Sequence, residues 1–326
     1  MITHLAFLLF FGKAHGLFAF LFGASFHIQQ LNNVRKGIAH HRRMLVRMSW
    51  LFVLGIFHGL FYPGDILCLL AIFGIVLLPM ARLSNRMLMG LAVLLALQPV
   101  LLFRSLSVPV DPSYGEQHMD LLLRSLRDDG ILQLFRNNST QNRLIEISLG
   151  FSSGRIFQLC AWMLMGIVVS RSGHFRPSVS SNGRIYALVT ITSIVAYLML
   201  HFQFTDPALA DLAARWKEVL MVSIYISLAL MLARSMHFFT RPTIIGKYSR
   251  MSLTNYIGQG LIGSVLFYGY GAGLYKLGAT WSLLVGIAVL FIQLAFSVWW
   301  LKRRASGPLE KLWSDLVSWS DRRTRS

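Results

Sequence analysis

The chain has 326 residues, of which 55% are hydrophobic and only 13% are charged, and its formal net charge is +18. Soluble globular proteins carry about 25% charged residues, so this composition excludes an ordinary soluble domain and indicates a membrane protein. The positive charge does not indicate nucleic-acid binding, because no basic segment is interleaved with exposed aromatic residues or lies away from the apolar stretches.

Nine long apolar stretches follow one another, each close to the ~20 residues with which a helix crosses ~30 Å of hydrocarbon. They cover residues 14–30, 45–62, 66–83, 87–103, 150–170, 184–204, 216–233, 251–270 and 281–301. We therefore predict an all-α protein, a polytopic transmembrane helical bundle of about nine spans. An N-terminal span group (1–104) and a C-terminal span group (150–301) flank a long connection.

Basic residues are concentrated in every second connection, and the four connections concerned contain no Asp or Glu. They are residues 35–47, 82–86, 171–184 and 234–250, and the tail from Lys302 is basic as well. Cytoplasmic loops carry an excess of Lys and Arg, so the pattern predicts an outside N-terminus and a cytoplasmic C-terminus. Membrane lipids are the partners that such a bundle implies. Cys68 and Cys160 both lie within apolar stretches, so no disulfide framework is expected.

Two segments outside the spans have amphipathic patterns. In the extracytoplasmic connection (105–149), apolar residues at 119, 122, 123 and 126 predict a helix on the outer surface over 116–127, ended by a turn at 128–130. In the tail (302–326), the run 306–310 predicts a helix start with Pro in its first turn. Leu, Trp and Val residues then share one face, which predicts a cytoplasmic interfacial helix.

Several sequence blocks together resemble one family. They are GKYSRMSLTNYIGQ (246–259), FYGYGAGL (267–274), GPLEKLW (307–313), FFGK (10–13), LFG (21–23), the pair Arg42-Arg43, His58-Gly59 and GDIL (64–67). They resemble the YeiB-like family, bacterial membrane proteins classed as domain-of-unknown-function family 418, and imply a multi-pass protein of the bacterial inner membrane. That family usually opens with a helix carrying a Leu-Asp-x-Leu-Arg-Gly element, which has no match here, so we expect a shortened start.

The opening and the span pattern of that family are in turn similar to the transmembrane acyltransferase superfamily, a likeness at the level of the fold. This similarity implies acyl transfer from cytoplasmic acyl-CoA, the expected donor, to a glycan or lipid-linked acceptor outside. No resident cofactor is expected, and His40-His41 lacks the Cys or acidic companions of a metal site.

His58 and Asp65 are the first candidate catalytic pair, because they flank a Pro63-Gly64 turn between two spans. A carboxylate beside an imidazole orients the ring and stabilises its charged form, which suits a general base. The alternative is structural: a helix cap or an interfacial polar pair. Gly59, beside His58, lies at small-xxx-small spacing from an earlier glycine, which favours close helix packing here.

Arg155 is the third candidate, since a charge inside a span costs ~3 kcal/mol or more unless it is paired or hydrated. Asp65 or Glu146 is its expected partner, and the alternative is an Arg that snorkels to the outer interface. Lys13 and His15 fall at the same predicted level. We expect Lys13, His58, Asp65 and Arg155 to line one outward-facing cavity.

Asn255 and Gln259 lie four residues apart at the cytoplasmic start of the eighth span, where they share one helix face. Their amides suit either ligand binding or hydrogen bonds to a neighbouring helix. Lys247 and Arg250, just before them, suit either the phosphates of acyl-CoA or ordinary positive-inside anchoring.

Three classes of function remain open. Acyl transfer ranks first, and a small-molecule transporter or permease is the alternative. Against transport, no carboxylate lies deep in a span and only the N-terminal run shows an obvious helix break. A non-enzymatic membrane scaffold is the third class.

Overall fold

The computed structural model describes residues 12–37, 40–99, 101–103, 113–175, 183–200, 207–235 and 243–323. Throughout these residues the regular structure is helical and no strand occurs, so the predicted all-α class is confirmed. Residues 1–11, which include the first two positions of the FFGK block, lie outside the described residues.

The helices follow the predicted stretches closely, and each of the nine apolar stretches contains one. They are α2 (Lys13–Arg35), α3 (His40–Phe61), α4 (Leu67–Met80), α5 (Asn85–Ala96), α7 (Ser113–Asp128), α8 (Ile131–Ser139), α9 (Gln141–Ser152), α10 (Arg155–Arg171), α11 (Gly183–Met199), α12 (Pro207–Ser235), α13 (Ile244–Ser249), α14 (Ser252–Phe267), α15 (Gly278–Leu301) and α16 (Pro308–Arg323), with a short 3₁₀ turn η1 (Leu274–Lys276). The helix predicted over 116–127 is α7, and the predicted tail helix is α16.

Four helical segments in the described part of the chain are long and apolar enough to cross a membrane. They are His41–Phe61, Asn85–Phe103, Leu209–Ala233 and Gly278–Leu301, and a fifth candidate is the bent pair α9–α10. Helix α4 has only 14 residues, about 21 Å at 1.5 Å per residue, which is shorter than the hydrocarbon layer. The helices therefore indicate a membrane protein, while the count of nine spans and the orientation of the termini stay predictions.

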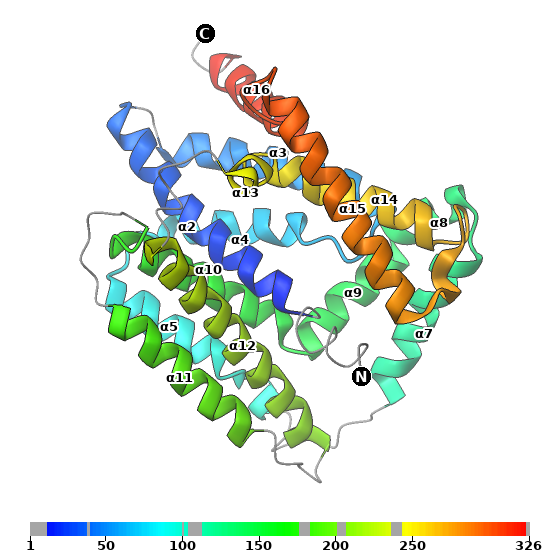
Figure 1. Ribbon diagram of the computed structural model, residues 1–326, viewed down its shortest axis with the longest axis horizontal. Coiled ribbons are helices and arrows are strands. Elements are labelled where there is room, and N and C mark those ends of the chain that lie inside the picture. Colours follow the sequence, from blue (N-terminus) through cyan, green and yellow to red (C-terminus); the bar gives the residue numbers. More distant parts are fainter. Residues whose placement is uncertain are drawn as a thin grey trace.

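Helices α2 and α10 pack at the centre of the molecule (Figure 1). Their backbones approach closely because glycines lie at the crossing: a Cβ at Gly23 would lie 1.9 Å from the carbonyl oxygen of Met163, and one at Gly166 would lie 2.0 Å from that of Phe20. Small residues at helix crossings permit such contact in membrane bundles. The crossing therefore depends on the absence of two side chains.

The other helices are arranged around this central pair. Helix α5 lies against α10, α12 lies against both α2 and α11, and α3 pairs with α4 (Figure 1). Helix α15 is mostly exposed, because only 11% of its apolar 18-residue segment is buried within the protein. Trp281, Phe291 and Ile292 are among its exposed side chains. A helix that exposes apolar side chains along most of its length suits contact with hydrocarbon rather than with water.

The predicted fifth span differs from expectation at its start. Instead of one helix from Gly150, α9 ends at Ser152 and α10 begins at Arg155, with a 71° bend between them. Gly154 between the helices has φ 71°, a left-handed conformation that glycine adopts without steric cost. Arg155 is therefore the first residue of a helix, not a residue inside one unbroken span.

Candidate active site

His58 and Asp65 form a buried pair at the junction of α3 and α4. The distance from His58 Nδ1 to Asp65 Oδ1 is 2.8 Å, and the two side chains are 1% and 2% exposed. The last turn of α3 carries His58, and the short loop after Phe61 returns the chain so that Asp65 faces it. With the carboxylate ionised, Nδ1 carries the hydrogen and donates it, so Nε2 is the basic nitrogen. The sequence-predicted pair is thus brought together.

Asp65 is held by two further donors. Its Oδ2 accepts a hydrogen bond from the Cys68 backbone N–H at 3.2 Å, and its Oδ1 accepts one from the Tyr256 hydroxyl at 3.3 Å. The first bond caps the N-terminus of α4, so the helix-cap role also has its geometry here. The second bond comes from α14, which carries Tyr256. The Tyr256 ring also packs on His58, with ring centroids 5.1 Å apart. The carboxylate is therefore fixed from both sides.

The Nε2 atom of His58 is buried and has no hydrogen-bond partner among the described residues. It faces Gly260 on α14, where an added Cβ would lie only 2.1 Å from Nε2. A buried polar atom without a partner costs about 1–3 kcal/mol, so such atoms are usually satisfied by water or ligand. The arrangement leaves a basic nitrogen free to accept a proton.

Arg143 of α9 adds a cation next to this pair. Its Nη1 atom donates to the Cys68 sulfur at 3.5 Å, and a Cβ at Gly59 would lie 1.7 Å from its Nη2. The small residue predicted to permit close packing beside His58 therefore makes room for a guanidinium. Sequence reasoning missed Arg143 because the connection between spans was read as a surface loop. It also missed Tyr256 and Gly260, although both lie inside or beside the family block 246–259.

Arg155 lies in a different place from the His58–Asp65 pair. It lines a small void of about 10 Å³ together with His15, Gln158 and Glu218, and its buried Nε atom has no hydrogen-bond partner in the described part of the chain. Such a volume is close to the space of one water molecule. Within the described residues, Arg155 and Asp65 form no ion pair.

Tyr62 nevertheless lies within electrostatic range of both Arg155 and Asp65, so the single outward cavity stays a prediction. Lys13 interacts electrostatically with Glu218, which also accepts from Arg215 at 2.9 Å. Glu146, the other expected partner, lies within electrostatic range of Arg155. The bend at Gly154 places Arg155 at the start of α10, where it lies beside His15 of α2 and Glu218 of α12.

Asn255 and Gln259 belong to a hydrogen-bonded network between α13, α14 and α15. Asn255 Nδ2 donates to the Tyr248 carbonyl and to Ser297 Oγ, both at 3.2 Å. Gln259 Nε2 donates to the Tyr248 hydroxyl at 3.0 Å and to Gln293 Oε1 at 2.9 Å. Burial raises the pKa of the Tyr248 phenol, so it remains a donor, and its hydroxyl also donates to Gln293. The amide hydrogens are thus used between helices, which fits the structural alternative.

Arg250 and Lys247 are positioned by local structure as well. The Arg250 guanidinium donates to the carbonyl of Ala305, just before α16. Lys247 lies in the last turn of α13, where a cation interacts favourably with the helix C-terminus.

Helix α16 is fastened to α14 by reciprocal capping, here named the Thr254–Glu310 latch. Glu310 Oε1 accepts from the backbone N–H groups of Leu253 (2.7 Å) and Thr254 (3.0 Å), and Oε2 accepts from the Thr254 hydroxyl at 2.6 Å. In return, Thr254 Oγ1 accepts from the Leu309 N–H at 3.1 Å. Each helix start therefore satisfies donors of the other. The apolar face predicted to rest on the membrane also packs on protein, since Val317 is 1% exposed.

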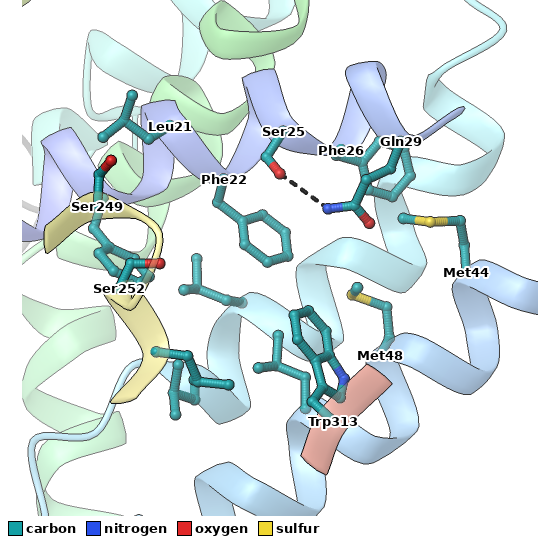
Figure 2. A pocket seen from close by; sticks show the side chains of 15 residues that line it. Leu21, Phe22, Ser25, Phe26, Gln29, Met44, Met48, Ser249, Ser252 and Trp313 are labelled. Carbon is teal, nitrogen blue, oxygen red and sulfur yellow. Dashed lines mark hydrogen bonds between the residues drawn. The ribbon is translucent and has the colours of Figure 1, made fainter. Parts of the chain in front are cut away.

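An apolar chamber of about 320 Å³ lies between α2, α3, α4, the junction of α13 and α14, and α16 (Figure 2). It is lined by Phe18, Leu21, Phe22, Ser25, Phe26, Gln29, Met44, Met48, Leu51, Leu67, Leu70, Ser249, Ser252, Leu253 and Trp313. Its volume falls within the ~300–1,000 Å³ range of small-molecule sites. Nothing in the sequence pattern predicted it, because its wall comes from five separate segments.

Residues 169–320 match the family described as "Protein of unknown function (DUF418)", which includes the blocks at 246–259 and 307–313. The C-terminal half of the chain is thus similar to this family. The chain is 26% identical over 327 residues to "Uncharacterized protein YxaH" of Bacillus subtilis (strain 168), covering 93% of this chain and 79% of that protein. It is 28% identical over 335 residues to "Uncharacterized protein YeiB" of Escherichia coli (strain K12), covering 92% and 80%.

A further relative is the "Uncharacterized 39.9 kDa protein in amylase 3'region" of Bacillus acidopullulyticus, 26% identical over 314 residues and covering 94% of this chain and 81% of that protein. No solved structure matches the chain significantly. The resemblance to YeiB-like proteins is thus confirmed over nearly the whole chain.

Proposed function

We propose that this protein is a membrane-embedded acyltransferase in which His58 is the general base. The observation that carries the proposal is the unpartnered Nε2 of a buried histidine whose Nδ1 donates to Asp65. This is the arrangement in which a carboxylate holds one tautomer of the ring and stabilises the imidazolium that forms. Transfer from acyl-CoA to a glycan or lipid-linked hydroxyl needs such a base.

The proposed step is balanced within these groups. The Nε2 atom of His58 takes the proton of the acceptor hydroxyl while the hydroxyl oxygen attacks the thioester carbonyl carbon. The C–S bond of the thioester then breaks. The leaving thiolate recovers a proton from the imidazolium, which restores neutral His58. Arg143, beside Asp65 and Cys68, supplies positive charge near the developing oxyanion.

Replacement of Gly260 by Ala tests the proposal directly. The new methyl group would meet His58 Nε2 at 2.1 Å, so either the ring must move from Asp65 or the free nitrogen is covered. General base catalysis contributes about 10²–10⁴-fold, and we expect Gly260→Ala to lose acyl-CoA turnover by at least the lower value. Gly263→Ala on the same helix is the matched control, because nothing lies within 4 Å of its added Cβ.

The measurement is release of coenzyme A thiol by purified protein with a panel of glycans and lipids, beside thermal stability in detergent. Equal turnover in the two alanine variants, both folded, would remove His58 from the reaction.

A transport function is the second candidate because of the 71° break between α9 and α10. Transporters place interrupted helices at their binding sites, and here the break carries Arg155 beside buried polar groups. Substrate uptake that persists in Gly260→Ala, without any acyl transfer by the wild-type protein, would favour transport.

A further inference from the structure

The apolar chamber is open on the side of α2. Leu21, Ser25 and Gln29 line it and follow one another at intervals of four residues, so they lie along one stripe of the helix. Leu21 is 57% exposed, and Ser25 is exposed as well. This stripe belongs to an apolar stretch that is predicted to cross the membrane, so a lipid chain can enter the chamber sideways without passing through water.

The lining of the chamber fits a hydrocarbon chain. Eleven of its fifteen lining residues are apolar. Figure 2 shows Phe22, Met48 and Trp313 around the space. Unbranched, flexible Met side chains adapt to irregular apolar partners, and no charged side chain lines the chamber. The lining therefore suits a chain of methylenes rather than a polar solute.

Arg47 of α3 places an unused hydrogen-bond donor beside the chamber. Its guanidinium lies 4.1 Å from the centre of the Trp313 ring, and its buried Nε atom has no hydrogen-bond partner among the described residues. Helix α3 contains no acidic residue, and Arg43 lies one turn before Arg47. A buried donor is usually satisfied by a ligand or by water, and a guanidinium binds phosphate through paired donors. The chemistry that Arg47 recognises is therefore that of an anion such as a phosphate diester.

Gln29 of α2 adds an unused acceptor. Its Nε2 atom donates to Ser25 Oγ at 2.9 Å, whereas its buried Oε1 atom has no hydrogen-bond partner in the described part of the chain. Figure 2 shows Gln29 on the same side of the chamber as Met44, which lies one turn before Arg47 in α3. A lipid head that carries both a phosphate and a hydroxyl group satisfies this donor and this acceptor together.

We propose that the chamber binds an anionic membrane phospholipid with a hydroxyl-bearing head, of the phosphatidylglycerol class. Its phosphate lies at Arg47, a head hydroxyl donates to Gln29 Oε1, and one acyl chain occupies the chamber. This pose agrees with the predicted topology, in which Arg47 begins a span at the cytoplasmic side and the chain then points into the membrane. The lipid contacts α16 through Trp313, so it holds the tail helix together with the Thr254–Glu310 latch. The inference goes beyond acyl transfer and does not depend on it.

Lipid retention by the purified full chain in detergent, measured by native mass spectrometry, tests the site without any turnover. Dioleoyl-phosphatidylglycerol and dioleoyl-phosphatidylcholine carry the same chains, so the ratio of their affinities reports the recognition of the head. The wild type should prefer phosphatidylglycerol by about tenfold, the ratio expected from one hydrogen bond to a charged group. Equal affinity for the two lipids would overturn the assignment.

Arg47→Gln should remove most of this preference and leave the affinity for phosphatidylcholine unchanged, because it removes the cation and keeps the chamber. Arg47→Lys keeps the charge without the paired donors and should remove the preference only in part. Arg86→Gln is the matched control, since it makes the same change at an exposed residue of α5, a helix that does not line the chamber. A preference that persists in Arg47→Gln, or that Arg86→Gln removes equally, would contradict a phosphate site at Arg47.

Ser25→Trp tests the position of the acyl chain, because Ser25 is an exposed residue of α2 that lines the chamber. We expect both lipids to bind at least about tenfold more weakly, with thermal unfolding as the check of the fold. Val34→Trp is the control, since Val34 is 64% exposed and the 100° helical step places it on the opposite face of α2. Equal retention by the two folded variants would overturn the chamber as the lipid site. Displacement of the lipid by free glycerol phosphate at equal concentration would do the same, because the head alone would then account for binding.

Discussion

The Thr254–Glu310 latch predicts that one carboxylate holds the tail helix on the bundle. Glu310 accepts three hydrogen bonds at the start of α14, two of them from backbone N–H groups that have no partner within their own helix. We expect Glu310→Ala to destabilise the folded protein and to release α16. Trp313, which donates to the Arg47 carbonyl at 3.1 Å, would then lose its position.

The magnitude follows from the groups that are left unsatisfied. Loss of a cap costs about 1 kcal/mol, and loss of a negative charge at a helix N-terminus adds about 0.3–1 kcal/mol. A partly buried N–H group without a partner costs about 1–3 kcal/mol, reduced where water reaches it. We therefore expect about 2–4 kcal/mol for Glu310→Ala. Glu310→Gln keeps an acceptor oxygen and should cost about 1–2 kcal/mol.

Thermal unfolding in detergent, with protease cleavage of the tail in parallel, measures both effects. Asp315→Asn on the exposed side of α16 is the control and should stay within about 0.5 kcal/mol of the wild type. Thr254→Ala combined with Glu310→Ala should show a coupling energy of about 0.5–3 kcal/mol, because the two side chains are in contact. A Glu310→Ala protein as stable and as protease-resistant as Asp315→Asn would refute the latch.

Three other predictions concern packing, the polar network and topology. Gly23→Ala should destabilise the fold by about 1–3 kcal/mol or more because its methyl group meets the α10 backbone, whereas Gly90→Ala meets nothing within 4 Å and should stabilise it by up to about 1 kcal/mol in thermal unfolding. Asn255→Ala leaves buried groups unpaired and should cost about 1–3 kcal/mol in thermal unfolding. Single cysteines at exposed Leu132 and Ser314 should label from opposite sides of the membrane, and labelling of both from outside would reject the orientation.

Local patterns predicted the elements well, because hydrophobic runs and helix-start signals act within a few residues. The tail helix was predicted from Pro308, and the His58–Asp65 pair from the short turn between them. The site of Arg155 was not, since residues 150–170 were predicted as one span and the break after Ser152-Ser153 was not recognised. Contacts between distant segments could not be predicted from local patterns. Tyr256 contacts Asp65 although they are 191 positions apart in the sequence, and hydrophobic periodicity describes only neighbouring residues.

The position of α16 also has a consequence for biogenesis. Chains emerge from the ribosome with the N-terminus first, and α16 follows every predicted span. Until it is synthesised, the first turn of α14 lacks the Glu310 carboxylate and the apolar chamber lacks the Trp313 wall. The wall of the apolar chamber is therefore completed after the candidate spans have been synthesised, by the final helix described. A nascent chain stalled before Pro308 would contain every candidate span and His58 but would lack the Trp313 wall.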